Sequence, residues 1–206
     1  MYPLTTSTNH PSAKSLPQWR SRDLSPLAFP FLSNVQHRLS SDLISHLMRV
    51  SQMAYEFGWA LGLRGPKLAS LRLGAFLHDI GKVFVPLKIL EKPGPLTAPE
   101  QRKVQQHVLY GCLISGVEDE RVQEVIAYHH EYWNGQGYPR GLQGPTIPYL
   151  ARIVAVADAF DAMTNERPYR PCFTHAQALQ RIEQCAGTQF DPYLADYFVN
   201  VFQARA

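Results

Sequence analysis

The chain has 206 residues, of which 45% are hydrophobic and 18% charged, values typical of a globular protein with one domain. The net charge of +3 is too small to indicate DNA or RNA binding, and no apolar run is long enough for a membrane span or a signal peptide. The three cysteines lack C-x-x-C spacing, which argues against a structural zinc site and favours reduced thiols. We therefore expect a cytoplasmic protein.

The first residues differ in composition from the rest of the chain. Residues 1–22 are rich in Ser, Thr and Pro and predict a flexible lead-in, so we place the folded domain at residues 23–206. From Ser40 onward, apolar residues recur at helical spacing, which predicts a long helix capped by Ser40 or Ser41 and ended by Gly62 and Gly65.

Further helix signals follow along the chain. Pro66 opens a second helix, and Thr97 with Glu100 forms a capping box for a helix that should run through His107 to about Ser115. Neither here nor later is there convincing alternation of apolar and polar residues with a period of two.

The second half of the chain shows the same kind of pattern. We expect a helix over about residues 120–130 and a strongly apolar helix that begins at Pro148. Thr174 with Gln177 repeats the capping box, and Asp191 caps the last helix. The sequence therefore predicts an all-α domain.

Several polar residues fall in unusually apolar surroundings. His78 and Asp79 come directly after an apolar helical face, while Asp158 and Asp161 lie inside the apolar stretch VAVADAFDAM. Burying an ionised carboxylate is costly unless a cation or hydrogen-bond donors compensate its charge. One such residue would suggest a buried ion pair or a helix cap; two apolar helices that each carry an acid favour a metal site.

Histidines add to this set from four predicted helices: His46, His78, His107 and the adjacent pair His129 and His130. Imidazole nitrogen together with carboxylate oxygen is a ligand set for divalent ions such as iron or manganese. Six or more such groups exceed what one ion needs, so the count indicates at least two metals.

The order of these motifs resembles a known family. The segments HLMRV, HDIGK and VADAFDA are similar to the HD superfamily of metal-dependent phosphohydrolases. The segments HHEYWNGQGYPRGLQG and NERPYR narrow the resemblance to the HD-GYP family of bacterial cyclic di-GMP phosphodiesterases. It extends from about His46 to the final helix, and it implies an all-α helical bundle of the HD-domain type with a central metal cluster.

The resemblance also implies a ligand set. The matching positions are His46, His78, Asp79, His107, His129, His130 and Asp158. Asp79 would bridge two divalent ions, with iron or manganese expected, and neighbouring histidines at a helix end can each face a different ion. Asp42, one turn before His46, is a candidate ligand for a third ion or simply a favourable charge at a helix N-terminus.

For the reaction, the resemblance implies that a metal-bridging hydroxide attacks the phosphodiester of cyclic di-GMP to give pGpG and then GMP. Asp79 and Lys82 are the expected catalytic residues, because Lys82 can stabilise charge on the phosphate. The alternative for Lys82 is a solvated lysine at a helix end. Asp161 should orient a ligand histidine without binding metal itself.

Substrate contacts are expected from two further motifs. The loop GQGYP supplies Gly137 and Tyr138, although Tyr138 could instead pack the loop against the bundle. Arg167 and Arg170 in RPYR can donate paired hydrogen bonds to phosphate or to a guanine edge.

Two other readings stay open. The chain could be a phosphohydrolase for another cyclic dinucleotide, or a non-catalytic adaptor that docks a diguanylate cyclase through the GYP loop. The full ligand set and Lys82 favour catalysis over the adaptor.

Overall fold

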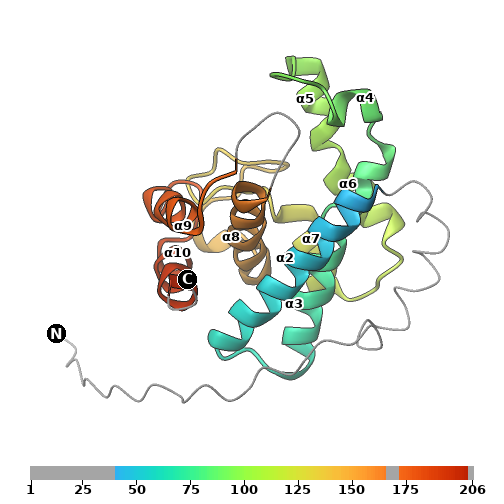
Figure 1. Ribbon diagram of the computed structural model, residues 1–206. Helices are drawn as coiled ribbons and strands as arrows, with labels where there is room; N and C mark the ends of the chain where they lie inside the picture. Colours follow the sequence, from blue (N-terminus) through green and yellow to red (C-terminus); the bar gives the residue numbers. More distant parts are fainter. Residues whose placement is uncertain (1–39, 166–171, 204–206) are drawn as a thin grey trace, which may run out of the picture.

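The computed structural model describes residues 40–165 and 172–203, and every regular element in these ranges is a helix (Figure 1). The predicted all-α class is therefore confirmed. The elements, in chain order, are α2 (Ser41–Ala60), α3 (Gly65–Leu77), η3 (Ile80–Phe84), α4 (Leu87–Leu90), α5 (Ala98–Gln105), α6 (His107–Ile114), α7 (Glu120–Tyr128), η4 (Gly144–Thr146), α8 (Tyr149–Thr164), α9 (His175–Gln184) and α10 (Pro192–Gln203). The predicted flexible segment at 1–22 lies outside the described residues.

Helix α2 begins and ends where the sequence indicates. Ser40 is its N-cap, and the Ser40 hydroxyl accepts a hydrogen bond from the Leu43 amide at 3.2 Å. Past its end, Gly62 takes a φ of 85°, which glycine adopts without steric cost. Helix α2 packs along α3 and against α8, so one of its faces points toward the centre of the bundle.

The apolar core lies around α8, which α2, α7, α9 and α10 all contact. Phe57 of α2, Phe160 of α8 and Phe198 of α10 are each at most 1% exposed and pack edge to face. Such aromatic burial stabilises the bundle strongly. No helix in the described part of the chain is long and apolar enough to cross a membrane.

The predicted helix from Ala98 to about Ser115 is wrong as one element. The structure divides it into α5 and α6, with Gln106 between them. Helix α6 packs closely on η3, whereas Figure 1 shows α4 and α5 extending from one end of the molecule. The break therefore lets α6 pack on the core while α5 points away from it. This packing depends on residues distant in the sequence, so local helix propensity cannot predict the break.

The remaining caps agree with the sequence. The Thr97–Glu100 and Thr174–Gln177 capping boxes are both formed, and the Asp191 carboxylate accepts from the amide of Tyr193 at 3.0 Å. The helix expected over 120–130 ends at Tyr128. His129 and His130 therefore follow directly after the last residue of α7.

Candidate metal centre

The predicted ligand side chains converge at the middle of the bundle from separate elements. Each comes from a helix or a helix end: His46 from α2, His78 and Asp79 from the junction of α3 and η3, His107 from α6, His129 and His130 from the end of α7, and Asp158 from α8. The structure therefore brings together the whole ligand set that the sequence predicts.

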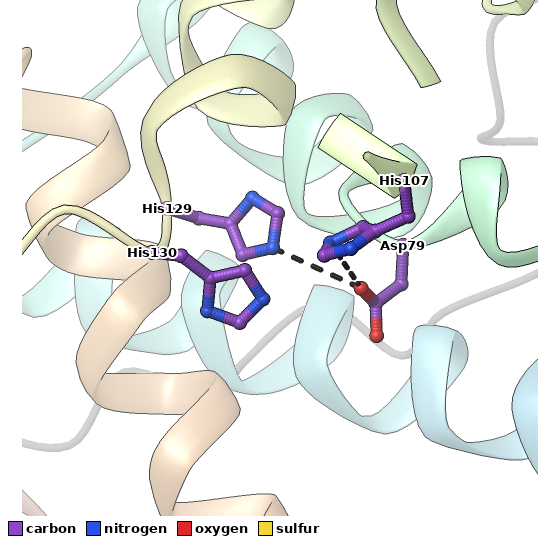
Figure 2. A group of neighbouring side chains, drawn as sticks. All are labelled: Asp79, His107, His129 and His130. Carbon is purple, nitrogen blue, oxygen red and sulfur yellow. Dashed lines mark ion pairs between the residues drawn. The ribbon is translucent and has the colours of Figure 1, made fainter. Parts of the chain in front are cut away.

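Two groups of ligand atoms form, and Asp79 belongs to both. The atoms within each group lie within 4.8 Å of one another. The first group is His46, His78 and Asp79; the second is Asp79, His107, His129 and His130. Figure 2 shows the second group, in which the Asp79 carboxylate lies opposite the rings of His107 and His129. Asp79 is thus placed where one carboxylate can serve two cation positions, as the predicted bridging role requires.

Asp158 adjoins the first group. Its Oδ1 atom is 3.3 Å from the Nε2 of His46 and 3.7 Å from the Nε2 of His78. With Asp158 included, the first group offers two imidazole nitrogens and two carboxylates, and the second offers three imidazole nitrogens and the shared carboxylate.

Four buried polar atoms in this cluster lack hydrogen bonds: His78 Nε2, Asp79 Oδ1, His107 Nε2 and His129 Nε2. Their side chains are at most 2% exposed. The Nε2 of His107 is 3.1 Å from Asp79 Oδ1, but the geometry is not that of a hydrogen bond. An unsatisfied buried polar atom costs about 1–3 kcal/mol, so the cluster needs a partner. Divalent cations bind this mixture of nitrogen and oxygen ligands, and the residues therefore fit a metal centre.

In the first group, the histidine pKa values are raised. Burial lowers the pKa of His46, but its hydrogen bonds with Asp158 and other carboxylates outweigh burial and raise the pKa to about 11. Burial likewise lowers the pKa of His78, while the charge of Asp79 and the nearby carboxylate of Asp158 raise it to about 9. Because metals bind deprotonated ligands, a cation must displace these protons.

In the second group, the pKa values of His129 and His130 are lowered. Burial lowers the pKa of His129 to about 4, despite the neighbouring Asp79. Burial, followed by the charge of His129, also holds the pKa of His130 well below its usual value. Both rings are therefore neutral and ready to donate lone pairs at neutral pH.

Lys82 lies in η3, one turn after Asp79, and its ammonium forms an ion pair with Asp79 Oδ2. Burial alone would raise the pKa of Asp79, but Lys82 and the nearby histidines hold it well below 3.8. Lys82 therefore compensates the charge of the central carboxylate. Asp42 is different: it is exposed and accepts from the Ser41 hydroxyl, and in the described part of the chain it makes no hydrogen bond or ion pair with the cluster.

Asp161 lies behind His46, on the side away from the cluster. Its Oδ2 atom is 2.7 Å from His46 Nδ1, which leaves Nε2 of the same ring facing Asp79 and Asp158. This is the arrangement expected of a carboxylate that orients a ligand histidine.

The GYP loop folds back over the cluster. The Tyr138 ring stacks on His130 with centroids 4.8 Å apart, and its amide donates to the His130 carbonyl at 3.1 Å. A Cβ at Gly137 would overlap the His130 carbonyl and the Tyr132 amide, so only glycine fits there. Burial raises the pKa of Tyr138, which keeps the phenol neutral. Tyr138 therefore packs the loop and also covers one wall of the cluster.

Sequence reasoning missed Glu131, which holds this loop. Glu131 is 2% exposed, and its carboxylate accepts from the amides of Arg140 at 2.7 Å and Leu142 at 2.9 Å. The available signal was an acid placed between the histidine pair and a glycine-rich loop whose amides need acceptors.

A cavity of about 390 Å³ opens onto the cluster. Lys82, His129, His130 and Asp158 line it, together with Arg181 from α9. Arg181 was not singled out from sequence because nothing local to α9 indicates that it faces the site. The predicted substrate residues Arg167 and Arg170 lie outside the described residues.

Comparison with known proteins agrees with this geometry. A family model described as HD domain matches residues 30–194. The chain belongs to the HD domain family. Within this family it is related to the HD-GYP cyclic di-GMP phosphodiesterases, as the sequence resemblance indicated. A solved HDG"Y"P protein from Bdellovibrio bacteriovorus has the same fold, with a TM-score of 0.64 over 84% of this chain and 56% of the other, at 23% identity.

Curated relatives of this HD domain differ in their named substrates. A 3'3'-cGAMP-specific phosphodiesterase of Vibrio cholerae is 36% identical over 80% of this chain and 32% of its own length. A cyclic di-GMP phosphodiesterase response regulator of Xanthomonas campestris is 40% identical over 73% of this chain and 41% of its own length. A cyclic di-GMP phosphodiesterase of Thermotoga maritima is 36% identical over 76% of this chain and 44% of its own length. The chain thus spans less than half the length of each.

Proposed function

We propose that the chain is a metal-dependent phosphodiesterase that hydrolyses cyclic di-GMP to linear pGpG and, in a second round, to GMP. The observation that carries this proposal is the cluster of buried, unpaired ligand atoms beside a cavity that is also lined by the cations Lys82 and Arg181. The kinship with curated cyclic dinucleotide phosphodiesterases supports the substrate class.

Two divalent cations fit the ligand groups. His46, His78 and Asp158 would hold one and His107, His129 and His130 the other, with Asp79 between them. Iron or manganese suits this mixture of imidazole and carboxylate. When bound, such a pair supplies an activated water and neutralises phosphate charge.

The protein's own residues would then bind and polarise the phosphodiester. Water adds to phosphorus, the bond from phosphorus to the 3′ oxygen breaks, and the water proton passes to that oxygen, leaving a 5′-phosphate and a 3′-hydroxyl. Lys82, which compensates Asp79 in this structure, is free to face the phosphate once Asp79 has another cation. The Lys82 ammonium would stabilise the negative charge that grows on the phosphate oxygens.

Arg181 would contribute to substrate binding. Its guanidinium can donate two parallel hydrogen bonds to a phosphate or to the O6 and N7 acceptors of guanine. Adenine replaces one of these acceptors by a donor, so an arginine in the cavity favours guanine. A second candidate substrate is 3'3'-cGAMP, because three relatives from Vibrio cholerae are named as specific for it.

The test is turnover by the full chain, purified anaerobically and supplied with iron or manganese. Cyclic di-GMP and 3'3'-cGAMP are offered separately, and products are separated by chromatography. We expect cyclic di-GMP to yield pGpG, and a chelator to stop the reaction. Turnover of 3'3'-cGAMP alone would reassign the substrate. An enzyme inactive on both substrates with both metals would overturn the catalytic proposal in favour of an adaptor.

A further inference from the structure

His46 differs from three other ligand histidines in what holds its outer ring nitrogen. The Nδ1 atom of each of the others lies against the backbone carbonyl of the residue three positions earlier in the chain: His78 at 2.7 Å from Ala75, His107 at 2.6 Å from Val104, and His129 at 3.1 Å from Ile126. The Nδ1 of His46 instead meets the side chain of Asp161, on a different helix. The orientation of this one ring therefore depends on side chains that a substitution can remove.

Asp161 is in turn held by Arg49. The Nε of Arg49 is 2.6 Å from Asp161 Oδ1, and its Nη2 is 3.0 Å from Oδ2. This paired geometry fixes the plane of the carboxylate and aims Oδ2 at His46. Asp161 is 1% exposed, so its charge needs such compensation, and the side chain of Arg49 reaches it from the surface with 41% of its area exposed.

We propose that Arg49 is a positioning residue for one of the two cation positions. Through Asp161 it holds the His46 ring with Nδ1 against the carboxylate, so that Nε2 faces Asp79 and Asp158, where a cation would replace its proton. His46 belongs only to the first ligand group, so loss of Arg49 weakens that position and spares the position formed by the second group. The inference rests on the proposed metal centre and is independent of which substrate is hydrolysed.

The experiment is a Mn²⁺ titration by equilibrium dialysis on the metal-depleted full chain, with its helical content checked by circular dichroism. The wild type should bind two ions. Arg49→Met should keep one affinity unchanged and weaken the other by about tenfold to hundredfold, the usual effect of losing a residue that supports a metal ligand. Arg49→Lys retains the charge without the paired geometry and should restore part of the lost affinity.

Arg121 offers a matched control. It forms the same paired contact with Asp119, with both distances 3.0 Å, and its side chain is 44% exposed. No ligand histidine lies behind Asp119, whose other oxygen contacts are with Ser70 and the Arg121 amide. Arg121→Met should therefore leave both Mn²⁺ affinities unchanged.

A second comparison tests whether Arg49 acts through Asp161. In the Asp161→Asn background, Arg49→Met should add little further loss, because the two residues act as one unit. The proposal is overturned if Arg49→Met leaves both affinities unchanged, weakens both equally, or adds fully to Asp161→Asn. A wild type that binds fewer than two Mn²⁺ ions overturns it as well. Failure of cyclic dinucleotide turnover would overturn the proposed substrate but none of these binding results.

Discussion

The backbone of Gly81 lies directly against the backbone of His107. A Cβ at Gly81 would overlap the His107 carbonyl oxygen and the Gly111 amide, which are both backbone atoms and cannot move aside as a side chain can. This close approach of η3 to α6 brings His107 to Asp79, two residues before Gly81. The glycine in HDIGK thus helps to assemble the candidate metal centre.

Gly81→Ala should therefore destabilise the protein and displace His107. We expect a loss of about 1–3 kcal/mol in the free energy of unfolding, measured with urea, together with weaker metal binding. Gly111→Ala, at the same interface, is the comparison: its Cβ would meet the side chain of Ile126 at 2.8 Å instead of backbone atoms, so we expect a smaller loss. An equal or smaller effect at Gly81 would contradict this role of the glycine.

Asp79→Ala should remove the carboxylate shared by both ligand groups. We expect metal content and activity to be lost together, since each position loses a ligand. Metal analysis and turnover on the same preparation check this result. The control is Asp196→Ala, an exposed aspartate of α10. Normal turnover by the Asp79 variant would contradict a role for Asp79 as the carboxylate shared by two cations.

Lys82→Ala should lower kcat by about a hundredfold while metal content and fold stay nearly intact. The reason is that one ammonium near a partly desolvated phosphate is lost, and such a donor acts mainly on the transition state. Steady-state kinetics measure the effect, with the exposed Lys88→Ala as control. A change confined to KM would show that Lys82 only binds substrate.

Arg181→Ala should mainly raise KM. Loss of a charged hydrogen bond typically costs about 1.5–3 kcal/mol, which corresponds to tenfold or more in affinity. The same expectation applies to Arg167 and Arg170. Kinetics with cyclic di-GMP measure it, and Arg102→Ala on α5, exposed, is the control. If Arg181→Ala leaves KM unchanged and lowers kcat, this arginine acts on the reaction step instead.

Much of this site could be predicted from the sequence, because its ligands are residue types that an apolar helix does not otherwise carry. Asp158 and His78 stood out for that reason, and the helix that carries His46 was marked by its cap at Ser40. The all-α class and most helix bounds followed from periodicity and capping.

The parts that escaped prediction depend on contacts between distant segments. The break at Gln106 follows from packing of α6 on η3, which no local propensity records. The role of Glu131 depends on amides nine and eleven residues later in the chain, and that of Arg181 on α9 lying beside the cavity. Arg49 has the spacing of an exposed helical residue, and only the fold shows that it meets Asp161.

We propose that seven side chains from five segments of the bundle hold at least two divalent cations that serve phosphodiester hydrolysis. The most direct measurement is the metal content per chain of anaerobically purified protein, taken alongside cyclic di-GMP turnover by the same sample. We predict at least two iron or manganese ions per chain and formation of pGpG. One ion or fewer per chain in an active preparation would contradict the claim.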